Sequence, residues 1–311
     1  MKVLVTGGAG FVGHNLALRL DHSGHDVTAL DNLSNGLERN LWNSSVRLRI
    51  ADVAEVESFN ALDSNYDSVV HLAALGSVPR SLRAPREVIT TNVLGTLNAL
   101  EFARRNGAHF ILASSSSVYG ENQTVPMRET SAIRPVSPYA ASKASAEQLA
   151  LVYARAYDLE ILVFRLFNVY GPGQRWDAEY PAVIPVWIDA ALNDSVVAVN
   201  GDGEQVRDFT FVDDVVSVME KSITKRERAS QPINLAFGAP MSLNSVLHLL
   251  EETLGREIRR EHRLDRQGDI RNSFADASAL KALFPDITGT ALPMGLERTI
   301  EWVRGMRIQQ L

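Results

Sequence analysis

Short apolar runs alternate with longer amphipathic segments along the first half of the chain. Strands are predicted where Val, Leu and Ile cluster in runs too short for buried helices, at residues 2–5, 27–30, 46–50, 68–72, 110–113 and 161–166. Helices are predicted where apolar residues recur at helical spacing, at residues 14–23, 86–105 and 137–157. Strands that alternate with helices predict a doubly wound, parallel α/β sheet.

A glycine-rich turn joins the first strand to the first helix. Gly7, Gly10 and Gly13 repeat at every third position between Thr6 and the helix. The first glycine permits the tight turn, the second lets a pyrophosphate approach the backbone, and the third allows the helix to pack closely on the sheet. This pattern predicts that the sheet is a Rossmann fold that binds a dinucleotide.

An acidic residue ends the second strand. Asp31 lies 18 residues past Gly13, where a carboxylate accepts hydrogen bonds from the adenosine ribose and repels a 2′-phosphate. The next residue is Asn32 rather than a basic one, which favours NAD over NADP. Asp52 and Val53 follow the third strand, where they could reach the adenine.

A tyrosine and a lysine at helical spacing form the next candidate site. Tyr139 and Lys143 lie on one face of a helix that Ser137 could cap and Pro138 could begin. An ammonium beside a phenol lowers the phenol pKa, so Tyr139 could act as a base. The alternative is an ordinary pair of surface residues, and the dinucleotide signature upstream favours the functional interpretation.

Small residues follow the two strands nearest this helix. Ala73 and Ala74 end the fourth strand, where a cofactor could pass closely, and a run of serines at 114–117 ends the fifth. Serine runs usually form polar loops. Because ligands of parallel sheets bind beyond the carboxyl ends of the strands, we expect these serines to face the same crevice as the glycines.

The regular alternation ends after Asn168, where Gly171-Pro172-Gly173 interrupts it. We therefore expect an NAD-binding domain at 1–170 and a smaller mixed α/β substrate domain at 171–311, with about 208–238 returning to the first. An apolar strand is predicted at 209–212, and Asp213-Asp214 predicts a helix start, because acidic residues favour helix N-termini.

Composition narrows the possible partners. The 311 residues carry a net charge of -6, which argues against nucleic acid and anionic membranes. The chain contains no cysteine, which excludes disulfides and thiolate metal sites, and no metal ion is expected. No apolar stretch reaches the ~20 residues of a membrane span, and the first apolar run meets glycines by residue 7, so no signal peptide is expected. A cytoplasmic enzyme is expected.

The motifs together resemble an extended short-chain dehydrogenase/reductase of the nucleotide-sugar 4-epimerase branch. The resemblance covers nearly the whole chain and is carried by T-G-G-A-G-F-V-G (6–13), D-N-L-S-N-G (31–36), H-L-A-A (71–74), S-S-S-S-V-Y-G (114–120), S-P-Y-A-A-S-K (137–143), R-L-F-N-V-Y-G-P (165–172) and G-D-G-E-Q-V-R-D-F (201–209). It implies a catalytic triad of Ser115, Tyr139 and Lys143. It also implies NAD contacts from Gly7, Gly10, Phe11, Val12, Asp31, Asn32, Asn35, Gly36, Asp52, Val53, Leu72, Ala73, Ala74, Asn92, Tyr139 and Lys143.

Two positions favour epimerisation over dehydration. Dehydratases of the resembling superfamily carry an acidic pair, or Cys-Glu, directly after the catalytic Ser or Thr. Ser116 and Ser117 stand there in this chain, and neither takes a proton from carbon at neutral pH.

The resemblance also implies a UDP-sugar site in the C-terminal part. Its residues would be Ser77, Ser115, Asn168, Val183, Arg207, Arg266, Asp269 and Ser273, with Arg271 a weaker phosphate candidate. Arg207 suits a phosphate because guanidinium is a planar fork, although a single arginine is more often a surface charge. A bulky tyrosine in place of Ser273 excludes an N-acetyl group in the resembling enzymes, so the serine favours UDP-GlcNAc and UDP-GalNAc.

The resemblance finally implies a homodimer held by a four-helix bundle of the segments 86–105 and 137–157. Leu94, Leu97, Phe102, Leu149 and Val152 could supply its contacts, unless they face their own sheet. Rival functions are a UDP-glucuronate 4-epimerase, a 4-ketoreductase, a dehydratase, a decarboxylating dehydrogenase or a non-catalytic nucleotide-binding regulator.

Overall fold

The structure is a computed structural model that describes residues 1–120, 124–264 and 270–308. The chain forms two compact units. The first unit comprises residues 1–122, 129–166 and 216–234, and the second comprises 123–128, 167–215 and 235–311.

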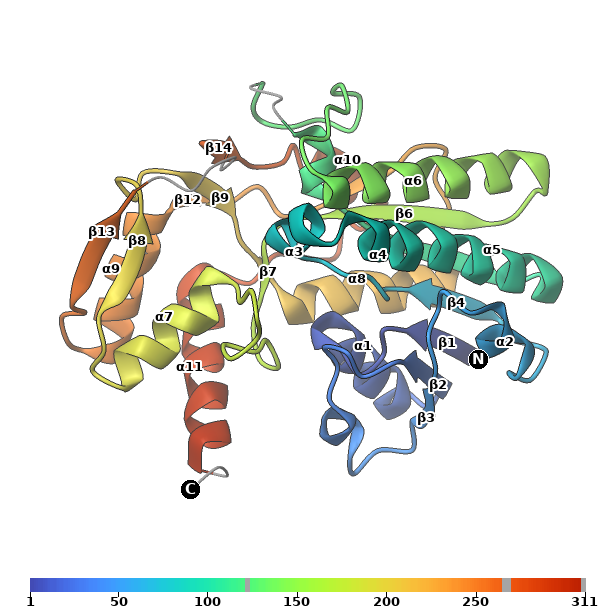
Figure 1. Ribbon diagram of the computed structural model, residues 1–311, viewed down its shortest axis with the longest axis horizontal. Coiled ribbons are helices and arrows are strands. Elements are labelled where there is room, and N and C mark those ends of the chain that lie inside the picture. Colours follow the sequence, from blue (N-terminus) through green and yellow to red (C-terminus); the bar gives the residue numbers. More distant parts are fainter. Residues whose placement is uncertain (121–123, 265–269, 309–311) are drawn as a thin grey trace. The chain divides into compact units, whose positions relative to one another are not determined.

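A seven-stranded sheet in the order β11-β6-β5-β4-β1-β2-β3 forms the centre of the first unit (Figure 1). Its strands are β1 (Lys2–Thr6), β2 (Asp26–Asp31), β3 (Arg47–Ile50), β4 (Ser68–His71), β5 (His109–Ser115), β6 (Ile161–Leu166) and β11 (Ile233–Leu235). Every pair from β3 to β6 is parallel, with Leu4 opposite both Thr28 and Val69. The predicted doubly wound Rossmann sheet is confirmed.

The strand order reverses at β1. From β1 the chain winds outward to β2 and β3, then crosses back to β4 and winds to β5 and β6 on the other side. The loop after β1 therefore lies beside the end of β4, and ligands of such sheets bind at this reversal.

Helices cover both faces of the sheet. Figure 1 shows α4, α5 and α6 along one side and α1 along the other. The helical segments of this unit are α1 (Phe11–His22), η1 (Glu38–Leu41), α2 (Val56–Asn60), α3 (Val78–Arg83), α4 (Pro85–Ile89), η2 (Thr90–Leu94), α5 (Gly95–Asn106), η3 (Ser116–Tyr119), α6 (Pro138–Ala156) and most of α8 (Val212–Lys225). Apolar side chains of α5, α6 and the strands share one core, including Phe102, Phe110 and Ala150.

The helix predicted at 86–105 is interrupted. A π turn at Thr90–Leu94 separates α4 from α5. The hydrophobic pattern of residues 86–105 predicts a single helix and does not mark this turn. The side chain of Asn92 within this turn is buried, accepts the Leu75 N–H and donates to the Ser142 hydroxyl.

The second unit contains smaller sheets and its own core. Its strands pair as β10-β7, β12-β9-β14 and β13-β8. Their bounds, with those of the helices, are β7 (Val169–Tyr170), α7 (Val183–Leu192), β8 (Val197–Asn200), β9 (Val206–Asp208), β10 (Thr210–Phe211), β12 (Pro240–Ser242), α9 (Leu243–Leu254), β13 (Arg260–Arg263), β14 (Asn272–Ser273), α10 (Ser278–Leu283) and α11 (Leu292–Ile308). Trp187, Phe211, Leu247 and Leu296 are buried together in its core.

The strand predicted at 209–212 is shorter in the structure. It ends at Phe211, and Val212 begins α8, with Asp213 and Asp214 in the first helical turn as predicted. Asp214 accepts hydrogen bonds from the backbone and hydroxyl of Thr290, so it also ties the helix start to a neighbouring loop. Among the described residues, no helix has both the length and the apolar character needed to cross a bilayer.

Candidate functional site

The turn after β1 leaves the first amides of α1 available. Gly10 precedes the helix, no side chain caps its N-terminus, and no acidic residue lies in its first turn. Gly7 has a φ of +68° and donates its N–H to the Leu30 carbonyl. Uncapped amides at a helix N-terminus form a binding site for phosphate oxygens, so the backbone at Phe11 and Val12 suits a pyrophosphate.

The loops after β1 and β4 are in direct contact. A Cβ on Gly7 would lie 2.7 Å from the Ala73 nitrogen, and a Cβ on Gly13 would lie 1.9 Å from the Gly7 carbonyl oxygen. The Ala73 N–H donates to the Thr6 hydroxyl, and the Leu72 N–H donates to the Thr6 carbonyl. Glycine at 7 and 13 is therefore required for this close packing. Ala74 continues the same loop and is half-buried.

Asp31 is held against the glycine turn. Its carboxylate accepts the Ala9 N–H at 3.0 Å and the Leu33 N–H at 2.8 Å. A Cβ on Gly36 would lie 2.9 Å from both Ala9 and the Asp31 carboxylate, which accounts for glycine there. Each carboxylate oxygen keeps a lone pair for a hydroxyl, which fits a ribose. The neighbouring Asn35 is exposed.

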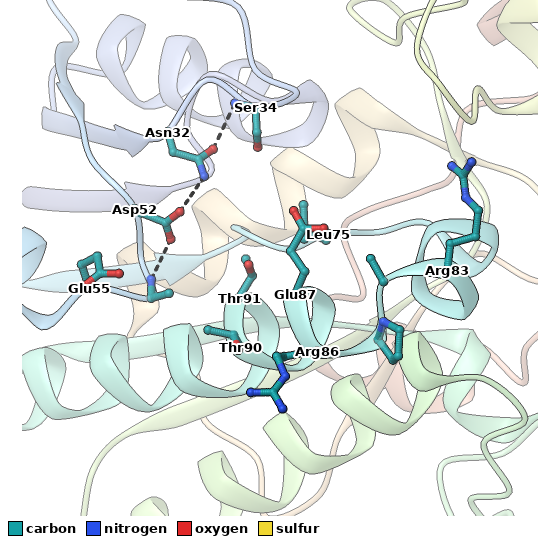
Figure 2. A pocket seen from close by; sticks show the side chains of 13 residues that line it. Asn32, Ser34, Asp52, Glu55, Leu75, Arg83, Arg86, Glu87, Thr90 and Thr91 are labelled. Carbon is teal, nitrogen blue, oxygen red and sulfur yellow. Dashed lines mark hydrogen bonds between the residues drawn. The ribbon is translucent and has the colours of Figure 1, made fainter.

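A cavity of about 660 Å³ opens in the first unit next to Asp31 (Figure 2). Asn32 and Asp52 line one side, and Leu75, Thr90 and Thr91 line another. The Asp52 carboxylate accepts hydrogen bonds from the Asn32 side chain at 2.9 Å and from the Ala54 N–H at 2.8 Å. The size and mixed lining suit a nucleoside. Val53 is buried behind Asp52, and its carbonyl accepts from Asn98.

Ser115, Tyr139 and Lys143 lie at the carboxyl end of β5 and in the first turns of α6. The predicted helix start is confirmed: Ser137 accepts the Ala140 N–H at 3.1 Å, and Pro138 is the first helical residue. Ser115 Oγ accepts from the backbone and the hydroxyl of Ser117 at 3.2 Å and 2.9 Å. Lys143 Nζ donates to the Ala113 carbonyl at 2.9 Å.

The electrostatics of this cluster differ from the expectation. Burial raises the pKa of Tyr139 above its ordinary value, and a side-chain hydrogen bond with Ser115 opposes the rise. Burial also lowers the pKa of Lys143 to about 8, against the attraction of Glu147. Burial is the largest influence on the Tyr139 pKa, and the Lys143 ammonium donates a hydrogen bond to the Ala113 carbonyl.

Sequence analysis missed a buried polar network beneath the cluster. Glu147 accepts both the Nε and Nη2 groups of Arg165 at 2.9 Å, and Ser114 Oγ donates to it at 2.6 Å. Arg165 also bonds Tyr119, whose hydroxyl donates to Asn234. An arginine within the apolar run 161–166 was the signal, because a charge in a buried strand needs a buried partner.

His71 was also missed. It is fully buried at the end of β4, its Nδ1 lies 2.7 Å from the Thr6 hydroxyl, and its ring stacks on Phe110. Burial and the charge of Lys143 lower its pKa to about 3, so the ring is neutral at physiological pH. A histidine at the polar end of an otherwise apolar run was the available signal.

Asn92 is placed differently from the other predicted cofactor residues. It is almost wholly buried, and its amide bonds the Leu75 backbone and the Ser142 hydroxyl. Ser77, a predicted substrate residue, caps α3 by accepting the Arg80 N–H at 3.2 Å.

In the second unit the structure brings Arg207 and Ser273 together. They are register partners in the parallel pair β9–β14, and Ser273 is buried. Arg207 Nη1 also donates to the carbonyls of Val206 and Arg271. The Arg271 guanidinium forms a bidentate pair with Asp202 at 2.7 and 2.8 Å, which weakens the case for Arg271 as a phosphate ligand.

The remaining substrate candidates are more scattered. Asn168 is exposed and has a φ of +24°, a conformation that asparagine tolerates better than most residues. Val183 is the first residue of α7. Arg266 and Asp269 lie outside the described residues.

Comparison with known proteins decides the family. Residues 3–236 match the NAD dependent epimerase/dehydratase family. The chain belongs to this family. The predicted resemblance is confirmed at this level, and so are NAD as the cofactor and an enzymatic role.

Relatives of this family align over nearly the whole chain. A UDP-glucuronate 4-epimerase from Thermodesulfobacterium geofontis is 33% identical over 96% of this chain and 95% of its own. A solved UDP-N-acetylglucosamine 4-epimerase from Methanobrevibacter ruminantium, in complex with UDP-N-acetylmuramic acid, is 34% identical with a TM-score of 0.93 and covers 100% of this chain and 99% of its own. A solved structure of a UDP-glucose 4-epimerase from Thermotoga maritima with UDP-glucose is 34% identical and has a TM-score of 0.92. It covers 99% of this chain and 100% of its own.

Proposed function

We propose that this family member is a UDP-sugar 4-epimerase with tightly retained NAD, acting on UDP-GlcNAc and UDP-GalNAc and also on UDP-glucose and UDP-galactose. The observation that carries the proposal is the placement of Ser115, Tyr139 and Lys143 at the carboxyl edge of the sheet, the edge that also carries the glycine turn and Asp31.

Each side chain of the cluster has a task in this reaction. When held by these residues, NAD would supply reversible hydride acceptance at C4 of the hexose, so net redox is zero. Tyr139 would take the proton of the 4-hydroxyl, directly or through Ser115, and return it later. Lys143 would donate a hydrogen bond to the nicotinamide ribose. In that position its positive charge would stabilise the Tyr139 phenolate. The amides of Phe11 and Val12, with Asp31, would hold the pyrophosphate and ribose.

The residues next to Ser115 support epimerisation over loss of water. Ser116 and Ser117 begin η3, and their hydroxyls offer no base at neutral pH. Glu147, the buried acid nearest along α6, already accepts three hydrogen bonds from Ser114 and Arg165. It is therefore committed to the fold.

The choice of UDP-N-acetylhexosamines rests on Ser273. Its small side chain lies beside Arg207, which we assign to the diphosphate together with Asn168. Val183 would border the uracil, and Arg266, Asp269 and Ser77 complete the proposed set. A UDP-glucuronate 4-epimerase is the second candidate, supported by the 33% identity to an enzyme of that name.

We also propose a homodimer through the helices α5 and α6. Val152 is exposed on α6, Leu94 is exposed in η2 directly before α5, and Ile89 is exposed on α4. Phe102 is unsuited to such contacts because it is buried in the core of its own unit, and Leu97 and Leu149 pack against that core. Sedimentation equilibrium would test this, since Val152→Glu should dissociate a dimer held by this face.

The experiment that tests the function is incubation of the purified protein with UDP-GlcNAc, without added NAD, followed by resolution of UDP-GlcNAc from UDP-GalNAc. Interconversion supports 4-epimerisation, retained NAD and space for the N-acetyl group together. Turnover of UDP-glucuronate alone would transfer the proposal to the second candidate. Net consumption of NADH, or loss of water or CO₂ from the product, would refute epimerisation.

Tyr139→Phe serves as the matched variant for this assay. It should lose orders of magnitude in kcat while the fold survives, because only the phenolic oxygen is removed. Tyr157→Phe, at an exposed position near the end of α6, should retain full activity.

A further inference from the structure

The side chain of Asn92 joins three separate parts of the first unit. Its Oδ1 accepts the Leu75 N–H at 2.8 Å, and its Nδ2 donates to the Leu75 carbonyl at 3.3 Å and to the Ser142 hydroxyl at 2.9 Å. Asn92 is 1% exposed, so these bonds form away from water. Both amide hydrogens are used within the protein, and none remains for a ligand.

Ser142 passes this connection to Tyr139. Its hydroxyl accepts from Asn92 and donates to the Tyr139 carbonyl at 2.7 Å. Ser142 is completely buried. A hydroxyl that accepts one hydrogen bond and donates another is polarised by both, which strengthens the chain. The backbone of the proposed base is thus fixed by a side chain as well as by its helix.

The π turn directs Asn92 into this position. It occupies Thr90–Leu94, between two regular helices. Each residue advances an α-helix by about 100°, so one extra residue in a turn redirects the side chains by roughly that angle. Single π turns are frequent at functional sites. The Thr96 hydroxyl donates to the Asn92 carbonyl at 2.6 Å.

The side-chain amide of Asn92 is also connected, through Leu75, to the cavity beside Asp31. Leu75, which Asn92 bonds on both backbone groups, lines that cavity, and so do Thr90 and Thr91 from the π turn (Figure 2). Three hydrogen bonds, Leu75–Asn92, Asn92–Ser142 and Ser142–Tyr139, therefore connect the wall of the nucleoside-sized cavity to the first turn of α6.

We propose that Ser142, held by Asn92, is a positioning residue that fixes the Tyr139 turn against the wall of the cofactor cavity. The proposal rests on the proposed role of Tyr139 as the base. Asn92 then acts through Ser142 and Leu75 rather than as a direct cofactor ligand. Ser142 would affect the alignment of the phenol with Ser115 and leave UDP-sugar affinity unchanged.

Ser142→Ala tests this in the holoenzyme, with Ser145→Ala as the matched control. Ser145 lies on the same helix and its hydroxyl donates to the Ala141 carbonyl at 2.9 Å, but the residue is exposed and does not reach Asn92. Ser142→Ala should lower kcat about tenfold, the value of one neutral hydrogen bond, with KM unchanged. Ser145→Ala should change neither constant, and Ser142→Thr, which retains the hydroxyl, should recover most of kcat.

A second readout does not require turnover. The ionisation of Tyr139 is followed as the ultraviolet difference between each protein and its Tyr139→Phe counterpart. In Ser142→Ala the Tyr139 titration should move to higher pH, because a misaligned phenol loses the Ser115 hydrogen bond that favours ionisation. A merely structural serine would lower thermal stability and leave this titration in place.

The outcomes separate this inference from the proposed function. Wild-type kcat and an unmoved titration in Ser142→Ala overturn the positioning role, as does an equal loss of kcat in Ser145→Ala. A moved titration in a protein that turns over no UDP-sugar refutes the epimerase proposal and supports the positioning of Tyr139.

Discussion

Arg165 and Glu147 form a fully buried, bidentate ion pair one helical turn from Lys143. Their side chains are 3% and 0% exposed, and both carboxylate oxygens lie 2.9 Å from guanidinium nitrogens. Arg165 also bonds Tyr119 and the Glu129 carbonyl, so the pair joins α6, β6 and η3. A buried pair with its remaining groups satisfied specifies one arrangement of these elements, and α6 carries the catalytic candidates Tyr139 and Lys143.

Replacing one member of this pair should be costly. Glu147→Gln leaves the Arg165 charge buried without its counterion, and we expect a loss of about 3–5 kcal/mol in the free energy of unfolding. Urea denaturation measures it. Asp63→Asn, which breaks the exposed pair of Lys2 and Asp63, should cost no more than ~1 kcal/mol. Equal effects of the two substitutions would contradict the role given to the buried pair.

His71 should make the protein sensitive to acid. Its pKa is about 3 in the folded protein, against an ordinary value of 6.5, so below pH 6.5 the unfolded chain takes up a proton that the folded chain does not. Stability is therefore lost as pH falls from 6.5 towards 3, by on the order of 4 kcal/mol. Denaturation at a series of pH values measures the free energies of unfolding of the wild type and of His71→Gln. The stability advantage of the wild type should shrink as pH falls from 6.5 towards 3. His22→Gln, at an exposed position, should show no such change.

Gly7 should determine whether NAD is retained. An alanine Cβ there would meet the Ala73 nitrogen at 2.7 Å, and the residue has a φ of +68°. Gly7→Ala should displace the loops after β1 and β4, and the purified protein should release little NAD on denaturation. Gly24→Ala provides the control, because Gly24 has a φ of +79° and no atoms nearby. Gly24→Ala should lower the free energy of unfolding by roughly 1–2 kcal/mol, because alanine is strained in the left-handed conformation, and should leave the NAD content unchanged.

Ser273 should govern which sugar is accepted. Ser273→Tyr fills the space beside Arg207, so kcat/KM for UDP-GlcNAc should fall at least about tenfold while that for UDP-glucose is retained. UDP-glucose is the internal control, since a misfolded variant would lose both activities. Unchanged turnover of UDP-GlcNAc would remove Ser273 from the sugar pocket.

The sequence predicted the sheet and the tight turn after β1 because local signals determine them. Apolar runs defined the strands, and the glycines with Asp31 marked the turn at the point where strand order reverses. Ser137 and Pro138 marked the start of α6. These features depend on residues close together in the chain, so a single sequence contains them.

Features that depend on distant partners were not predictable in this way. Asn92 of the π turn bonds Leu75 and Ser142, and the partner of Arg165 lies 18 residues away on another element. The burial that raises the Tyr139 pKa was not predictable from spacing, and neither was the hydrogen bond from Lys143 to the Ala113 carbonyl. The arrangement of Arg207 beside Ser273 needed the register of two strands that are far apart in sequence.

The path of the chain between its two units has a consequence for dissecting the protein. After β6 the chain leaves the first unit at residue 167, returns for 216–234 and then leaves again. The returning segment supplies Glu220, which pairs with Arg19 of α1 at 2.5 Å, and Asn234, which bonds Tyr119. A fragment ending at residue 166 would therefore lack a strand and a helix of its own sheet. A fragment that contains the whole first unit would therefore need residues 216–234 joined to residues 129–166.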